Sequence, residues 1–385
     1  MSLAVAFSTR ATLGLVMPVW QAELGWTASF ISGVAASAFI IMALTAPIAG
    51  LMLDRVGPRT SPSVGLFLVA IGAGLVATTS SAVVFAIGFA GVAAVGFGIV
   101  ALHTVSTAVA LVFDRNRGLA TGLATSGSTG GQLLVVPLVA VLLTTMSWRW
   151  SFGGLAVMAA LGAVAVLIML PKTASSTSAR SGSSMETLQL LARSPVFNLL
   201  FWSFFLCGFT TAGVIETHLL PFSSFCGFPP LPSATAYGLL SAVNLGGMIL
   251  AGYLSDWIDK IRLLASIYAP RAGTFVVLIM LPDLGIEWLL AFAVMFGVVD
   301  YSTVPVTAGL VASHLGVKVM GVAMGVISGG YALGAAAGAF AGGCLFDGFG
   351  NYGSVWFTAL ALSLLAAVLV ICVPRDLAVS NEAAL

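Results

Sequence analysis

The chain has 385 residues, of which 59% are hydrophobic and only 7% are charged. A soluble domain carries about 25% charged residues, so this composition excludes an ordinary soluble protein and indicates a lipid environment. The net charge of +1 leaves no long-range field that would attract nucleic acid.

Apolar runs long enough to cross a bilayer follow one another along the chain. A spanning helix needs about 20 mostly apolar residues, and lipid excludes open strand edges, so these runs predict helices. The first run contains Arg10 and lacks a preceding basic segment, so it is not a signal peptide. Because it barely reaches the length of a span, we expect either a start upstream of Met1 or an unusually short first helix. The expected spans are 2–20, 27–52, 61–79, 82–113, 118–146, 151–170, 196–220, 234–255, 262–281, 287–313, 319–345 and 353–373.

The twelve expected spans fall into two halves. Residues 171–195 are rich in Ser and Thr, which cannot form a core, so they predict a linker, with a short surface helix after Ser184. Residues 1–170 then form an N-terminal six-helix bundle and residues 196–385 a C-terminal one. Gly50-Leu-Met-Leu-Asp54 is echoed by Gly252-Tyr-Leu-Ser-Asp256, and Gly118-Leu-Ala-Thr-Gly122 by Gly321-Val-Ala-Met-Gly325. Repeats of six helices are typical of transporters.

Most of the 14 Lys and Arg residues fall on loops of one side of the membrane. The positive-inside rule makes that side cytoplasmic, so we expect both termini and the linker in the cytoplasm. These basic loop residues are Arg55, Arg59, Arg115, Arg117, Lys172, Arg180, Arg193, Lys260, Arg262, Lys318 and Arg375.

Two loops carry motifs that resemble those of a known family. The first reads Gly50-Leu-Met-Leu-Asp54-Arg55-Val-Gly57-Pro-Arg59 and resembles the G-x-x-x-D-R-x-G-x-R loop of the major facilitator superfamily. Residues 113–127 are similar to the F-x-K/R-x-R-x-L-A-x-G-x-A-x-A-G motif of the monocarboxylate porter family, with Ser126 in place of an alanine. The resemblance implies the major facilitator fold, an all-α membrane protein with twelve transmembrane helices in two pseudo-symmetric six-helix bundles.

The chain departs from the family at two places. The acidic-Gly-aromatic motif of the first helix has no counterpart. The eighth-helix pattern D-x-x-x-R-P-x-x-G aligns on Asn244-Leu-Gly-Gly-Met248-Ile-Leu-Ala-Gly252, without the acid or the arginine. An anion must therefore be bound by residues elsewhere.

The loop motifs also predict a conformational latch on the cytoplasmic face. Asp54 ends the second span while Arg55 and Arg59 begin the next turn, so they can bridge helix ends. Positive-inside anchoring alone is the alternative, above all for Arg59. The latch set is Gly50, Asp54, Arg55, Gly57, Arg59, Arg115, Arg117 and Asp256.

Small residues recur every four positions on the fifth and eleventh spans. Such ladders let helix backbones approach closely. Because these helices meet across the two halves in the superfamily, we expect the ladders to form the seam about which the halves rock. Packing within one half is the alternative. The ladders are Gly118, Gly122, Ser126 and Gly130, and Gly330, Gly334, Gly338 and Gly342.

Four ionisable residues fall near the middle of the membrane, where a charge costs roughly 2.5 kcal/mol or more. Arg10 and His103 each lie about 15 Å from a span end at 1.5 Å per residue, and Arg271 and Asp300 lie at similar depth. The resemblance places three of the four on helices that line the family's central cavity. Arg10 has no nearby acid, so it predicts a contact with a substrate carboxylate, the alternative being a buried structural pair.

The other mid-membrane groups allow two roles each. Asp300, on one helical face with Thr303 and Thr307, is predicted either as a proton carrier or as a fixed counter-ion of Arg271. His103 can bind a carboxylate, relay a proton or simply pack. Glu216 and His218, just before Pro221, can take up protons at the outer mouth or lie in an exposed vestibule. Arg10, His103 and Arg271 are thus the expected substrate-binding residues, and Asp300, Glu216 and His218 the proton-coupling ones.

Together these features predict a secondary active transporter of small organic anions such as monocarboxylates, working by alternating access in the plasma (inner) membrane. Proton symport is expected, because the chain has no G-x-x-x-x-G-K-S/T nucleotide-binding loop. The expected partners are the anion, the proton and the bilayer, with no cofactor, metal or nucleic acid. Alternatives are an anion antiporter, an exporter of hydrophobic compounds or, in a different class, a non-transporting membrane receptor. The absence of H-E-x-x-H and G-x-S-x-G motifs disfavours an enzyme.

Overall fold

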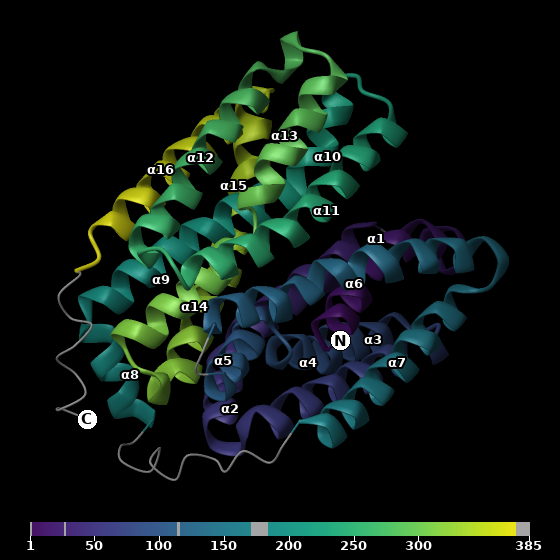
Figure 1. Ribbon diagram of the computed structural model, residues 1–385. Helices are drawn as coiled ribbons and strands as arrows, with labels where there is room; N and C mark the ends of the chain where they lie inside the picture. Colours follow the sequence, from purple (N-terminus) through teal and green to yellow (C-terminus); the bar gives the residue numbers. More distant parts are fainter. Residues whose placement is uncertain (1, 27, 114–115, 171–183, 375–385) are drawn as a thin grey trace.

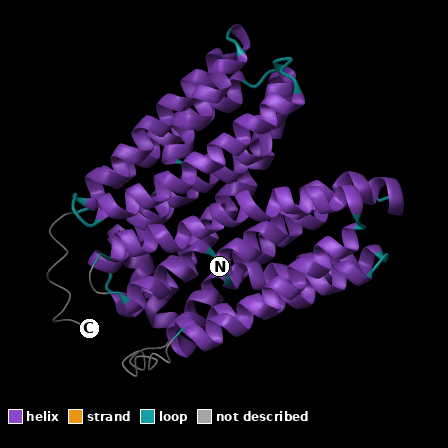
Figure 2. Ribbon diagram, turned by 45° about the vertical axis from the view of Figure 1, so that its right-hand side comes forward, coloured by secondary structure: helices purple, strands orange, loops and turns teal. Residues whose placement is uncertain are grey.

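The computed structural model describes residues 2–26, 28–113, 116–170 and 184–374, and its described elements are all helical (Figure 2). In these residues, nine helical segments are long and apolar enough to cross a membrane. Counting the long helix α2 (Ala28–Thr78) as two, and adding α1 (Ser2–Leu24) and α6 (Arg117–Thr145), gives the twelve expected passes. The expected all-α fold of two six-helix bundles is confirmed (Figure 1).

The N-terminal bundle extends from α1 to α7. Its core is aromatic at one end, where Trp20 packs on Trp148 and Phe152. Besides α1, α2 and α6 it contains α3 (Ala82–Ala86), a π-helix (Ile87–Ala93), α4 (Ala94–Ile99), α5 (Leu102–Val112) and α7 (Trp148–Met169).

The C-terminal bundle follows α8 (Ser184–Arg193), the short helix expected after Ser184. The rest of the Ser/Thr-rich stretch, 171–183, lies outside the described residues. The bundle comprises α9 (Pro195–Gly208), a π-helix (Phe209–Ile215), α10 (Glu216–Phe225), α11 (Pro230–Ser255), α12 (Lys260–Met280), α13 (Ile286–Val299), α14 (Thr303–His314), α15 (Met320–Phe349) and α16 (Gly353–Ile371), with short 3₁₀ turns at Leu281–Asp283 and Val317–Val319.

A backbone break at Gly57 divides α2 into the second and third passes. Gly57 adopts φ 84° and ψ 172°, a conformation that a residue with a side chain rarely takes, and Pro58 follows it directly. The loop expected at 53–60 is therefore reduced to a single kink. We call the end of the molecule where this kink lies the basic face, since Arg55, Arg117 and Lys260 lie there.

Two passes that the sequence predicts as continuous helices are broken near their middle. The fourth pass leaves helical geometry at Val100 (φ −92°, ψ 63°) and Ala101 (φ −110°, ψ 168°). The tenth pass breaks at Asp300 (φ −59°, ψ −85°), and α14 begins at Thr303. Pro305 explains the restart, because a proline lacks the N–H that the first turn of a helix does not need.

The bundles lie close together at the basic face and diverge toward the opposite face (Figures 1 and 2). At the closed end, a Cβ added to Gly325 of α15 would lie 2.6 Å from the carbonyl oxygen of Ala46 in α2. One added to Gly122 of α6 would lie 2.6 Å from that of Met248 in α11. These glycines allow close backbone approach across the bundles, so the ladder on the fifth span meets the other half as expected.

The glycine ladder on the eleventh span faces helices of its own bundle, away from the N-terminal bundle. A Cβ at each of its glycines would meet α9, α10 or the π-helix between them, all in the same bundle. The expectation that this ladder forms the seam between the halves is wrong, and packing within one half is what it does. The contacts are Gly330 with Phe201, Gly334 with Phe205, Gly338 with Phe209 and Gly342 with His218.

Candidate functional site

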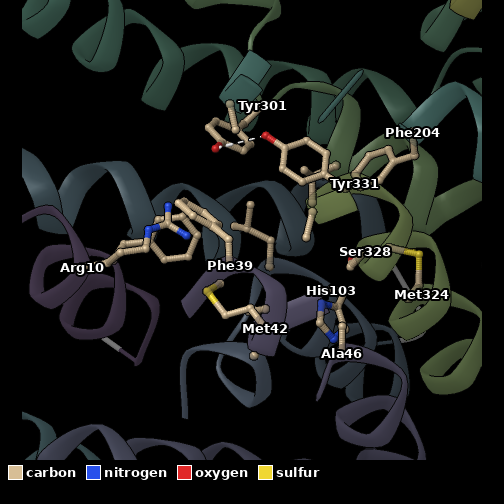
Figure 3. Close-up of a pocket in the computed structure, with 17 residues that line it drawn as sticks. Arg10, Phe39, Met42, Ala46, His103, Phe204, Tyr301, Met324, Ser328 and Tyr331 are labelled. Carbon is tan, nitrogen blue, oxygen red and sulfur yellow. Dashed lines mark hydrogen bonds between the residues drawn. The ribbon is translucent and has the colours of Figure 1, made fainter. Parts of the chain in front are cut away.

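A central cavity lies between the two bundles and has two chambers. The first, the apolar chamber, comprises about 720 Å³ of space that no atom occupies, open solvent included, and is lined mainly by aromatic and aliphatic side chains (Figure 3). The second, the polar chamber, comprises about 500 Å³ of such space and is lined by Ser, Thr, Gln, Asn, Glu and Asp side chains. Phe7, Arg10 and Tyr301 line both chambers, so these three residues mark their boundary.

Arg10 is the positively charged residue at the boundary between the two chambers. Its guanidinium carbon lies 4.5 Å from the centroid of the Phe7 ring and 5.3 Å from that of Phe39, so aromatic faces hold it by cation–π contact. Within the described part of the chain, the guanidinium forms no hydrogen bond and no ion pair. Its hydrogen-bond donors are therefore available to a ligand in the cavity.

A chain of hydroxyl groups connects the two chambers. The Tyr301 hydroxyl donates to Glu216 Oε1 at 2.8 Å, and the Tyr331 hydroxyl donates to the Tyr301 oxygen at 3.3 Å (Figure 3). Glu216 lines the polar chamber and Tyr331 the apolar one. Sequence reasoning missed both tyrosines, because neutral aromatic residues in a span resemble ordinary core.

Arg271 and Asp300 form a buried pair beside the polar chamber. Arg271 has no exposed surface, and its Nη2 lies 3.4 Å from Asp300 Oδ1. The same nitrogen donates at 2.9 Å to the carbonyl oxygen of Asp300, while Nη1 donates at 2.9 Å to Cys207 Sγ. The guanidinium also bonds the hydroxyl of Thr211, at 2.5 Å. Arg271 does not line either chamber, whereas Asp300 lines the polar one.

Asn244 holds the break in the tenth pass. Its Nδ2 donates to Asp300 Oδ2 at 3.1 Å, and its Oδ1 accepts from the backbone N–H of Tyr301 at 3.2 Å. The residue that replaces the family acid in the eighth-helix pattern thus positions both Asp300 and Tyr301. The sequence shows that an acid is missing at position 244, but it does not show the two groups with which the Asn244 amide forms hydrogen bonds.

The structure separates the two histidines. His103 lines the apolar chamber with 2% of its surface exposed, and neither ring nitrogen forms a hydrogen bond within 3.5 Å to a described residue, although the backbone of Ala46 interacts with the ring. His218 Nε2 lies 3.1 Å from the carbonyl oxygen of Ala339, and its ring packs near Tyr352. His218 lines neither chamber, so the structure does not bring it to Glu216 and Asp300.

At the basic face, aspartates cap helices of the opposite bundle. Asp54 of α2 accepts from the N–H of Val322 at 3.1 Å, in the first turn of α15. Asp256, after α11, accepts from the N–H groups of Gly118 and Leu119 at 2.7 and 2.9 Å, in the first turn of α6. These bonds between carboxylates and backbone N–H groups join helix ends of the two bundles.

The remaining latch residues surround these caps. Gly50 lies against the backbone of Gly321, where a Cβ would not fit. Arg55 is exposed and Arg59 partly buried near the Gly57 kink. The Nε of Arg117 donates to the carbonyl oxygen of Phe113 at 2.6 Å. Arg115 lies outside the described residues.

Two bundles of membrane-spanning helices, meeting around a cavity that both line, define a membrane transporter rather than an enzyme. The chain belongs to the Major Facilitator Superfamily, whose family model matches residues 1–339. This confirms the family expected from the loop motifs.

Relatives and solved structures agree with this membership. Human monocarboxylate transporter 11 is 26% identical over 97% of this chain and 81% of its own length. A chloramphenicol resistance protein of Streptomyces lividans is 31% identical over 66% of each chain. The fucose:proton symporter FucP of E. coli has the same fold, with a TM-score of 0.77 at 15% identity over 97% of both chains.

Proposed function

We propose that the protein carries small organic anions of the monocarboxylate type, together with protons, by alternating access. The observation that carries this proposal is Arg10, a guanidinium in the central cavity with aromatic neighbours and no carboxylate partner in the described chain. Such a group favours binding of an anion, because an unpaired charge away from bulk water is costly. The similarity to human monocarboxylate transporter 11 supports the same substrate class.

The proposed orientation places the basic face in the cytoplasm of a plasma (inner) membrane, with both termini on that side. The positive-inside rule supports this assignment. In this orientation, the face toward which the bundles diverge is the outer one.

Proton coupling rests on carboxylates of the polar chamber. Glu216 is held by the Tyr301 hydroxyl and has no cationic partner among the described residues. Asp300 has Arg271 as a close counter-ion. We therefore assign Glu216 as the proton carrier of the proposed transport cycle. We assign the Arg271–Asp300 pair a structural role, which is to stabilise the break in the tenth pass.

The test is binding and uptake by purified protein in liposomes. Arg10→Ala is expected to abolish binding of lactate or pyruvate, whereas Arg10→Lys retains part of it, because the ammonium keeps the charge but not the fork of donors. Arg149→Ala is the control, since Arg149 bonds Ser80 at the far end of the N-terminal bundle. Unchanged affinity in the Arg10→Ala protein contradicts the proposal.

A second candidate is an exporter of hydrophobic compounds. The apolar lining of the larger chamber favours it, as does the similarity to a chloramphenicol resistance protein. Uptake that needs Arg10 and is accompanied by proton entry supports the proton symporter. Exchange of anions without proton movement indicates an antiporter, and binding of neutral apolar compounds that is independent of Arg10 indicates the exporter.

A further inference from the structure

The apolar chamber contains a buried polar group that the proposed anion site does not use. His103 is 2% exposed, and neither ring nitrogen forms a hydrogen bond within 3.5 Å to a described residue. The backbone of Ala46 is the one group that interacts with the ring, so at least one ring nitrogen has no partner among the described residues. A neutral imidazole carries one donor and one acceptor, and leaving either of them buried without a partner lowers the stability of the folded protein. Because His103 lines the chamber, a ligand in it is able to supply the missing partner.

Arg10 and His103 stand apart across the chamber, with Met42 between them in the close-up (Figure 3). The wall around them is apolar and partly aromatic. Phe7 and Phe39 flank Arg10, and on the side of the C-terminal bundle the ring centroids of Phe204 and Tyr331 lie 5.4 Å apart. A ligand that contacts both Arg10 and His103 must therefore present a carboxylate, an apolar body and a second polar group.

The lining of the chamber agrees with such a ligand, because most of the side chains that form it are aromatic or aliphatic. A three-carbon acid that contacts Arg10 reaches the neighbouring rings of Phe7 and Phe39 but leaves His103, which stands apart from Arg10, without a partner. A ring-bearing acid extends further along the apolar wall and removes more apolar surface from water.

From these observations we infer that the preferred substrate is a hydroxyaryl monocarboxylate, with its carboxylate at Arg10, its ring against the aromatic wall and its hydroxyl at His103. A hydroxyl can donate to the unprotonated ring nitrogen or accept from the protonated one, so it can pair with the ring nitrogen that faces the ligand in either tautomer, whereas a purely accepting group can pair only with the protonated nitrogen. This inference rests on the proposed function, because it assigns the carboxylate to Arg10.

The test compares three acids on the full-length protein: propanoate, phenylpropanoate and para-hydroxyphenylpropanoate. In the unmodified protein, phenylpropanoate should bind more tightly than propanoate, and the para-hydroxyl should add a further 3- to 10-fold or so, the usual net gain from a hydrogen bond. His103→Leu should reduce that hydroxyl preference to about 1-fold, whereas His103→Gln, which keeps a donor and an acceptor, should retain part of it. His314→Leu is the matched control, because His314 is a buried histidine that lines neither chamber.

Each outcome decides a separate point. Equal hydroxyl preference in the unmodified and His103→Leu proteins, or propanoate binding as tight as that of phenylpropanoate, overturns the inference but leaves the anion transporter standing. Failure of all three acids to bind overturns the proposed function. In that case para-cresol, a neutral phenol, is the probe. Binding of para-cresol that depends on His103 supports the hydroxyl site at His103, whereas no such binding overturns the hydroxyl site too.

Discussion

The carboxylate of Asp54 accepts a 3.1 Å hydrogen bond from the backbone N–H of Val322, which belongs to the other bundle. Asp256 makes the reciprocal contact with the first turn of α6. Each half of the molecule thus contributes one carboxylate to a helix N-terminus of the other half, where the helix dipole favours negative charge. Separation of the two bundles at the basic face would break these contacts.

We expect Asp54→Asn to open the basic face more often. Loss of the charge weakens the helix cap by about 0.3–1 kcal/mol, which shifts a two-state equilibrium roughly 2- to 5-fold. The measurement is the labelling rate of a cysteine at Ser255, which is buried beside Gly118 in the closed seam, with the labelled site identified by peptide mass spectrometry. Asp259→Asn is the control, because Asp259 caps α12 within its own bundle. Equal labelling of position 255 in both variants would show that the cross-bundle cap does not stabilise closure.

Asp300→Asn should strongly destabilise the protein. Arg271 would lose its counter-ion in a site without exposed surface, and breaking a buried ion pair costs about 3–5 kcal/mol. Thermal unfolding in detergent measures the effect, and the double variant Asp300→Asn with Arg271→Gln should recover most of the loss. If Asp300→Asn instead unfolds like the unmodified protein and loses only uphill transport, Asp300 is the proton carrier.

Glu216→Gln should abolish proton-driven accumulation but preserve exchange of substrate across the membrane. Exchange requires no net proton release, and glutamine keeps the acceptor for the Tyr301 hydroxyl. Accumulation and exchange are measured in the same liposomes with an imposed pH gradient. Glu23→Gln is the control, because Glu23 accepts from Trp148 within one bundle and lines neither chamber. Accumulation that survives in Glu216→Gln would assign the proton to another group.

Gly334→Ala should lower the free energy of unfolding by about 1–3 kcal/mol. The new methyl group would meet the backbone of Phe205, which cannot move aside as a flexible side chain does. Gly343→Ala, on the same helix, is the matched control, since nothing lies within 4 Å of its Cβ position. Thermal unfolding in detergent compares the two. Equal unfolding temperatures would mean that α9 and α15 separate easily at this point.

The passes and their approximate ends were predictable because lipid demands long apolar helices, and the rarity of charges in them made Arg10 and Asp300 conspicuous. Tyr301 and Asn244 were not predictable, since neutral side chains carry no comparable penalty in a span. The direction in which Gly334 points was also hidden. A four-residue spacing identifies a helix face but not the neighbour that covers it.

The breaks at Val100 and Asp300 fall at corresponding places in the two halves, beside His103 and Tyr301 respectively. A continuous helix can bend sharply only if backbone hydrogen bonds within it break. An interrupted helix already lacks these bonds at the interruption, so it can bend there. In the tenth pass, the backbone carbonyl at the break accepts a hydrogen bond from Arg271, which offsets the lost helical partner. We therefore expect the short segments α5 and α14, on the basic-face side of these breaks, to change their orientation relative to α4 and α13 during alternating access.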